Sequence, residues 1–149
     1  MRLTAFSDVS LRVLMFLAGL DQQQQVSSQQ VAQGVGVPYN HVAKAVAFLA
    51  QEGWVESRRG RSGGVSLSEA GRQVSVGQVV RRAEGDQPLV DCGSPEGGCP
   101  LRGSCLLRGV LDQAREVFLR SLDGVVVASL TSSAGSGPVF LELSREPRR

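Results

Sequence analysis

The residues with the clearest capacity for chemistry are three cysteines that fall within one short loop. Six residues separate Cys92 from Cys99, and five separate Cys99 from Cys105. The intervening residues are rich in glycine and proline, and glycine lets a backbone approach closely and adopt positive φ. Three thiolates in such a loop can hold a zinc ion or an iron–sulfur cluster. Both groups normally take four protein ligands, so the loop supplies one too few.

Three other interpretations of these cysteines stay open from the residues alone. Free cysteines are often small buried hydrophobes, although a loop with few apolar neighbours is a poor place for three of them. One disulfide plus a free thiol is a second arrangement, but the odd number and the lack of a credible export signal count against it. A thiol redox switch without metal is the third. Metal or cluster binding is favoured, and the spacing does not separate zinc from iron.

The elements before this loop predict a helix-turn-helix. Ser27 or Ser28 caps a short helix, and Pro38 suits the first turn of a longer one that ends at Gly53. The longer helix has an apolar face of Val42, Ala45, Val46 and Leu49, and an outer face of Asn40, Ala43, Lys44 and Ala47. Polar groups mixed with small alanines can press into a major groove. The residues predicted to contact bases are Tyr39, Asn40, His41 and Lys44. An ordinary pair of helices with a solvated face is the alternative.

A basic β-hairpin is predicted directly after these helices, over residues 54–68, around a glycine-rich tip. Arg58, Arg59 and Arg61 crowd the tip with no acid among them. A charge run is usually only a solvated surface, but a basic hairpin in this place is typical of a winged helix whose tip meets phosphates or the minor groove. The net charge is only +2 over 149 residues, so contact with nucleic acid must come from such a local patch.

A long amphipathic helix is predicted after the cysteines, from a cap at Ser104 to about Leu122. Its apolar stripe is broad for a helix with one neighbour, so a dimer interface is favoured over plain core. The predicted fold is therefore mainly α with a small β-hairpin wing. Residues 1–85 form a winged helix-turn-helix DNA-binding domain, 86–105 a cluster-binding loop, 104–130 a dimerisation helix region and 131–149 a flexible tail.

The first helix is predicted to begin near Ser7, with Asp8 favouring the positive end of the helix dipole. Asp8 and Arg12 stand four residues apart, the spacing of a helical ion pair. The longest apolar stretch, Val9 to Leu20, is interrupted by Ser10 and Arg12 and is too short to span a membrane. We therefore expect no membrane association and a cytoplasmic location, where thiols stay reduced.

These residues together resemble the Rrf-type family of iron–sulfur winged-helix transcriptional regulators, which has NsrR-like and IscR-like branches. The resemblance covers about residues 1–130. It rests on the opening residues 1–12, the stretch 36–44, the wing at 59–64 and the three cysteines. IscR-like proteins use a histidine three residues after the third cysteine, where this chain has Arg108. NsrR-like proteins complete the cluster with an aspartate in the first helix of the other subunit, a position that Asp8 occupies.

The resemblance thus implies that Cys92, Cys99, Cys105 and Asp8 bind an iron–sulfur cluster, with 4Fe-4S favoured over 2Fe-2S. For Asp8, a plain ion pair with Arg12 is the competing interpretation. The implied function is a homodimeric repressor that binds double-stranded operator DNA and senses nitric oxide, releasing the operator on nitrosylation or loss of the cluster. The alternatives are an IscR-like regulator of iron–sulfur status and an electron-transfer or cluster-carrier protein. An enzyme is not expected, since the chain has one histidine and no nucleophile–base pair.

Overall fold

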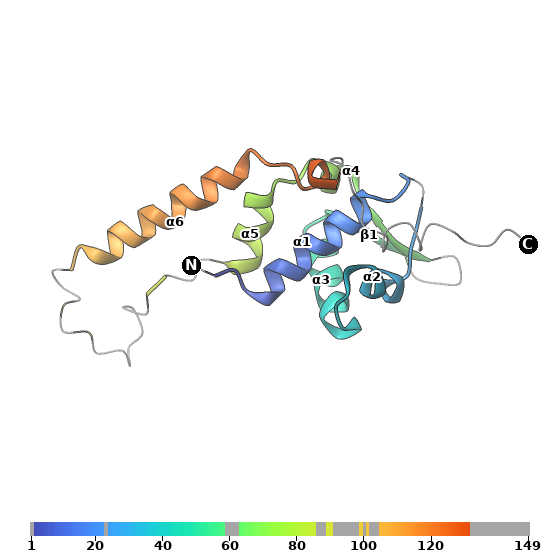
Figure 1. Ribbon diagram of the computed structural model, residues 1–149, viewed down its shortest axis with the longest axis horizontal. Coiled ribbons are helices and arrows are strands. Elements are labelled where there is room, and N and C mark those ends of the chain that lie inside the picture. The colour runs from blue at the N-terminus through green and yellow to red at the C-terminus, as the bar shows by residue number, and fades with distance from the viewer. Residues whose placement is uncertain are drawn as a thin grey trace, which may run out of the picture.

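The computed structural model of the 149-residue chain describes residues 2–22, 24–58, 63–85, 89–90, 99, 101 and 105–131. Its helices are, in chain order, α1 (Ala5–Ala18), α2 (Ser28–Val35), α3 (Tyr39–Gln51), α4 (Glu69–Gln73), α5 (Val76–Glu84) and α6 (Leu107–Asp123), followed by a 3₁₀ helix η1 (Val127–Thr131). The strands β1 (Val55–Arg58) and β2 (Gly64–Leu67) form an antiparallel hairpin (Figure 1). The predicted mainly helical fold with a β-hairpin wing is confirmed.

Helix α1 lies at the centre of the molecule and packs against α2, α3, α5 and η1 (Figure 1). Val13, Leu14 and Phe16 on this helix are completely buried. The ring of Phe16 occupies the space that a Cβ at Gly34 would need, so only glycine allows α2 to come this close. Gly34 lies within α2 itself. Gly36 makes the turn, with a left-handed φ of 66° that suits glycine.

The start of α1 differs from the prediction, because the cap is Thr4 and not Ser7. The Thr4 Oγ1 accepts a hydrogen bond from the Ser7 backbone N–H at 3.2 Å. The buried Ser7 hydroxyl donates instead to the carboxylate of Glu84 on α5, which also accepts from the backbone N–H and hydroxyl of Thr4 at 2.8 and 3.0 Å. Burial raises the pKa of Glu84, but these hydrogen bonds and Arg115 outweigh it and hold that pKa below its ordinary value. The first turn of α1 is therefore fastened to the end of α5.

The base of the hairpin is held from two sides. Val26 and Val65 exchange backbone hydrogen bonds of 3.1 and 2.7 Å, which adds a short third segment beside β2. On the other side, the Ser68 hydroxyl donates to the Gly53 carbonyl at 2.6 Å and accepts from the Gly71 N–H at 2.9 Å. Ser68 thereby caps α4, a five-residue helix that the sequence did not predict.

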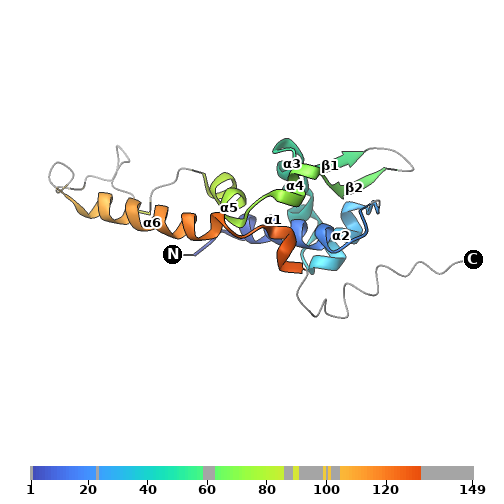
Figure 2. The same cartoon turned by 90° about the horizontal axis from the view of Figure 1, so that it is seen from above.

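Helix α6 extends away from the rest of the molecule, with its first turn far from the hairpin (Figures 1 and 2). It begins at Leu107 without a side-chain cap at Leu106, and the predicted cap Ser104 lies outside the described residues. Leu119 is its one buried residue. Apolar residues on the opposite side of the helix are exposed: Leu107 at 57%, Val110 at 60%, Val117 at 61% and Phe118 at 37%. These residues are therefore not part of the hydrophobic core of a single chain, and the interpretation of the stripe as core is wrong.

The chain after α6 returns to the body next to the start of α5. The Val76 N–H donates to the Val125 carbonyl at 2.8 Å, and the Val127 N–H donates to the Val74 carbonyl at 3.0 Å. Val127 is buried, and η1 packs on α1. Thr131, the first residue of the predicted tail, is the last residue of η1, and the rest of that tail lies outside the described residues. No helix in the described part of the chain is long and apolar enough to cross a membrane.

Candidate functional site

The exposed face of α3 carries the residues that were predicted to contact bases. All four residues of the predicted apolar face are buried: Val42, Ala45, Val46 and Leu49. All four predicted base contacts are exposed: Tyr39, Asn40, His41 and Lys44. Helix α2 packs against α3 and is joined to it by the turn at Gly36, as in a helix-turn-helix. No described side chain caps the first turn of α3, and within that turn the His41 N–H donates to the Pro38 carbonyl at 3.0 Å.

The hairpin lies next to α3, at the end of the molecule opposite the free end of α6 (Figure 2). Arg58 ends β1, and its side chain is 70% exposed, with Nη2 3.7 Å from Oε2 of Glu56. This surface ion pair is long and weak, so the guanidinium remains able to contact a phosphate. Arg59 and Arg61 fall outside the described residues. Of the three arginines in the predicted basic patch, the structure therefore describes only Arg58.

Two of the three cysteines fall within the described residues. Cys99 and Cys105 are free thiols with partly exposed side chains, and Cys105 stands two residues before α6. Cys92 lies outside the described residues. Uncrosslinked, accessible thiols suit an iron–sulfur cluster, which needs thiolate ligands and an entry path. Among the described residues, no group of three histidine, cysteine, aspartate or glutamate side chains could hold a metal ion.

The position that carries a histidine in IscR-like proteins is part of a surface ion pair here. Arg108 lies in the first turn of α6, with Nε 3.7 Å from Oδ2 of Asp112. A guanidinium stays protonated in proteins and offers no lone pair to a metal. His41, the single histidine, is exposed on α3. Neither residue is placed to complete a set of ligands with Cys99 and Cys105.

Asp8 is exposed on the first turn of α1, where both of its oxygens contact Arg12. Oδ1 accepts from Nε at 3.0 Å, and Oδ2 lies 2.9 Å from Nη2. In the single chain, Asp8 therefore forms the helical ion pair with Arg12 that the competing interpretation predicts. The two side chains are about half exposed, so the pair is weak and can be displaced by a stronger partner.

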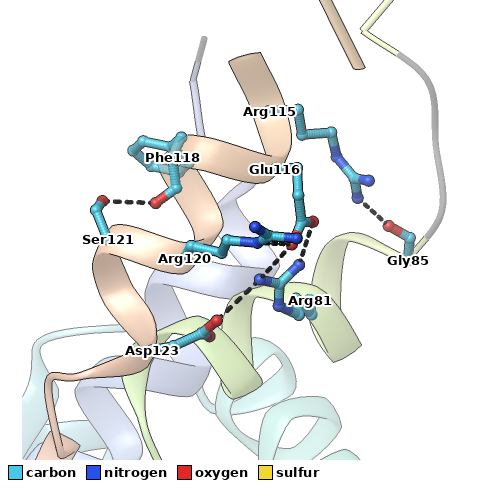
Figure 3. Close-up of polar contacts among 8 residues, drawn as sticks. All are labelled: Arg81, Gly85, Arg115, Glu116, Phe118, Arg120, Ser121 and Asp123. Carbon is cyan, nitrogen blue, oxygen red and sulfur yellow. Dashed lines mark hydrogen bonds and ion pairs between the residues drawn. The ribbon is translucent and has the colours of Figure 1, made fainter. Parts of the chain in front are cut away.

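The structure also shows a network of ion pairs on α5 that was not predicted from the sequence. Arg81 Nη1 lies 2.8 Å from Oε2 of Glu116, and its Nη2 lies 2.9 Å from Oδ2 of Asp123, so α5 holds α6 at two points (Figure 3). Arg120 adds a 2.9 Å contact to Glu116. Hydrogen bonds from Arg81 and Arg120 lower the pKa of Glu116 despite some burial. Arg115 donates to the Gly85 carbonyl at 2.5 Å.

Arg82, the next residue on α5, contacts the end of α3 instead. Its Nε donates to Oε2 of Glu52 at 2.8 Å, and its Nη2 donates to Oε1 at 2.7 Å. The hydrogen bonds from Arg82 lower the pKa of Glu52 against the effect of burial. In the sequence, this network is visible only as two adjacent arginines in the last turn of a helix. That pattern does not indicate which acidic residues they contact.

Comparisons with known proteins agree with this geometry. The profile of the Rrf2 family, described as an iron-dependent transcriptional regulator, matches residues 3–133. The HTH-type transcriptional repressor NsrR of Streptomyces coelicolor is 48% identical over 148 residues, which is 99% of each chain. The structure of T. potens IscR aligns with a TM-score of 0.68 at 19% identity, over 94% of this chain and 96% of that one. Staphylococcus aureus CymR aligns with a TM-score of 0.66 at 20% identity, over 89% and 100%. The two structures show a shared fold.

Substitutions on the two parts of the proposed DNA interface should have different effects. Lys44→Ala or Asn40→Ala should change which bases are preferred, because these exposed side chains face the groove in a helix-turn-helix. Arg58→Ala should weaken binding to all sequences and lower the salt dependence of log K by about one for each phosphate that the protein no longer neutralises. Selection from random duplexes, followed by titration at several salt concentrations, separates the two.

Arg120→Gln is the matched control, since it also removes one exposed positive charge, but from α6. It should leave base preference and salt slope unchanged. Equal effects of Arg58→Ala and Arg120→Gln on the salt slope would show that the wing makes no phosphate contact.

Proposed function

The chain belongs to the Rrf2 family of transcriptional regulators, and from this we propose that it is a cytoplasmic, nitric oxide-responsive repressor that binds operator DNA as a homodimer. It is a DNA-binding regulator and not an enzyme. The observation that carries the proposal is the 48% identity to the NsrR repressor over essentially the whole of both chains. Family membership implies an iron–sulfur cluster, and we propose the 4Fe-4S form.

The proposed ligands are Cys92, Cys99 and Cys105 of one subunit with Asp8 of the other. Cys99 and Cys105 are free and accessible, and Arg108 excludes the histidine ligand of the IscR-like branch. A carboxylate is a harder and weaker ligand for such iron than a thiolate. When bound, the cluster supplies iron that reacts with nitric oxide.

Asp8 has an alternative partner whenever it is not bound to iron. Because both oxygens contact Arg12 in the single chain, ligation requires at least one of these contacts to be given up. Once released, Asp8 can pair with Arg12 again within its own helix. Arg12 therefore stabilises the unligated state of the first turn of α1, and the exchange between partners gives two defined arrangements of this turn.

The homodimer is proposed from the exposed face of α6. Leu107, Val110, Val117 and Phe118 recur at helical spacing and point away from α5. A helix with an apolar face that its own chain leaves uncovered is typical of an interface, and a second copy would bury the same face on both helices. Two copies also provide the two reading heads that a two-fold operator requires.

Nitric oxide should lower the affinity of the cluster-loaded protein for its operator by roughly 100-fold, within the usual range of coupling between two sites. The probe is a duplex selected from random sequence by anaerobically purified holo-protein. The operator Kd is measured for holo-protein, nitric oxide-treated protein and apo-protein, with the absorption spectrum recorded in parallel. Equal Kd values in all three states would overturn the proposal, and a colourless protein containing stoichiometric zinc would overturn the cluster.

Asp8→Ala should change the absorption spectrum of the loaded protein and speed the loss of iron, because the fourth ligand is removed. Asp8→Cys should keep the cluster, since it replaces the carboxylate with a stronger ligand. Asp21→Ala removes an exposed aspartate just beyond α1 and should leave the spectrum unchanged. A normal spectrum and nitric oxide response in Asp8→Ala would reduce Asp8 to the partner of Arg12.

Val110→Glu and Val117→Glu should each shift the protein from dimer to monomer, because a charge would be buried in an apolar interface. Gln113→Glu places a charge at a polar position of the same helix and should leave the dimer intact. Sedimentation velocity at micromolar concentration reports the outcome, with circular dichroism confirming the fold. Unchanged dimers in both valine variants would exclude this face as the interface.

A further inference from the structure

The last turn of α5 contacts three other helices through three nearby side chains. Arg81 holds α6, Arg82 holds the end of α3, and Glu84 holds the first turn of α1. The carbonyl of Gly85, directly after the helix, accepts from Arg115 on α6 as well. Within the described chain, this turn is the one short segment whose charged side chains contact α1, α3 and α6 together.

The contact between α5 and α6 is tight enough to join the two helices as one body. Arg81 contacts Glu116 and Asp123, which stand about two turns apart on α6. Gly77 lets the backbones approach, because a Cβ there would strike Asp123 and come within 2.9 Å of the Leu119 carbonyl oxygen. Leu119 is buried at the same contact. Displacement of α6 would therefore carry α5 with it.

The contact between α5 and α3 fixes Glu52, the residue that caps the C-terminal end of α3. Glu52 follows the final residue of α3, and its side chain is only 16% exposed. Arg82 holds both carboxylate oxygens, and such a two-bond fork fixes orientation as well as distance. Gly53 comes next with φ of 77°, so the chain turns away directly after this point. Arg82 therefore holds the recognition helix at its C-terminal end.

The same end of α5 is tied to the element that carries Asp8. Glu84 accepts from Thr4 and Ser7, the cap and first-turn residues of α1, and Ser7 directly precedes Asp8. A change in the partner of Asp8 thus acts on a turn whose hydrogen bonds end on α5. Both proposed sources of cluster ligands, the first turn of α1 and the segment before α6, lead to this helix.

We propose that α5 links cluster state to the angle of the recognition helix, with Arg82 and Glu52 as the positioning pair through which α3 follows α5. This rests on the proposed function, since it requires that loss of the cluster moves α1 or α6. The Arg82 side chain is 61% exposed and borders an open hollow of about 210 Å³, lined by Glu52, Trp54, Gln78, Arg81 and Arg82. Arg82 and Glu52 are positioning residues and need not touch DNA or iron.

A charge-swap experiment tests the pair. Operator Kd is measured for holo-protein and nitric oxide-treated protein in the wild type, Arg82→Glu, Glu52→Arg and the Glu52→Arg/Arg82→Glu double variant. Each single variant should reduce the ratio of the two Kd values from roughly 100-fold to a few-fold. The double variant should restore it, because opposite charges face each other again. The absorption spectrum and its response to nitric oxide should be unchanged in all four proteins.

Asp112→Asn is the control, because it removes the ion pair with Arg108 that lies within α6 and leaves the contacts of Arg81 and Arg82 in place, and its ratio should equal that of the wild type. If a single charge reversal fails to fold, Arg82→Gln and Glu52→Gln replace it, with thermal unfolding measured for each. A folded single variant with the wild-type ratio, or a folded double variant without recovery, overturns this inference. A wild-type ratio of one overturns the proposed function instead.

Discussion

The fit between the Phe16 ring and the backbone of Gly34 determines where α2 lies, and through α2 where α3 lies. Phe16 is completely buried, and no side chain could stand at residue 34 without displacing it. Closely packed interiors respond to even small changes of volume, so this contact fixes the angle between α1 and the helix-turn-helix within narrow limits. Helix α1 also packs against α3, β2, α5 and η1, so its position affects both the helix-turn-helix and the hairpin of the proposed DNA interface.

Helix α6 is attached to the body by a different kind of force. It buries one residue, Leu119, and is otherwise held by the charged contacts of Arg81 and Arg115 and by the backbone anchor at Val127. Charged contacts between partly exposed groups have defined geometry but are weakened by salt. A body held together by hydrophobic packing is thus joined to a helix, α6, that is held mainly by polar contacts to α5.

Features encoded by neighbouring residues could be predicted from the sequence. The two faces of α3 follow from helical periodicity, and Ser27 and Ser75 each form a capping box with a glutamine three residues later. The predicted start of α1 at Ser7 was wrong, because the actual cap, Thr4, is held by a hydrogen bond to Glu84, a residue 80 positions away. The same limit applies to the partners of Arg81 and Arg82, and to the short α4, whose cap Ser68 needs the carbonyl of Gly53.

The candidate site was predictable to the same degree. The exposed residues of α3 that are proposed to contact bases could be identified because one helix presents them all. The proposed iron ligands require a loop closed around a cluster and, for Asp8, a second subunit, and neither is a property of local sequence. Asp8 has the features of an ordinary helix-terminal carboxylate in one chain, with Arg12 as its partner. Its further role rests on resemblance to a family.

The pairing of Val74 and Val76 with Val125 and Val127 has a consequence for how such proteins diversify. The chain enters α5 at Val76 and has left α6 when it reaches Val125, and backbone hydrogen bonds join these two points. Between these points α5 packs on α1 and α6 packs on α5, so the helices at both ends of the segment that joins α5 to α6 are held in place, and changing the length of such a segment alters closure entropy only slowly. The segment that carries the cysteines could therefore be lengthened, shortened or exchanged for one with different chemistry while the scaffold beneath keeps its shape. One reading head can in this way acquire many different signals.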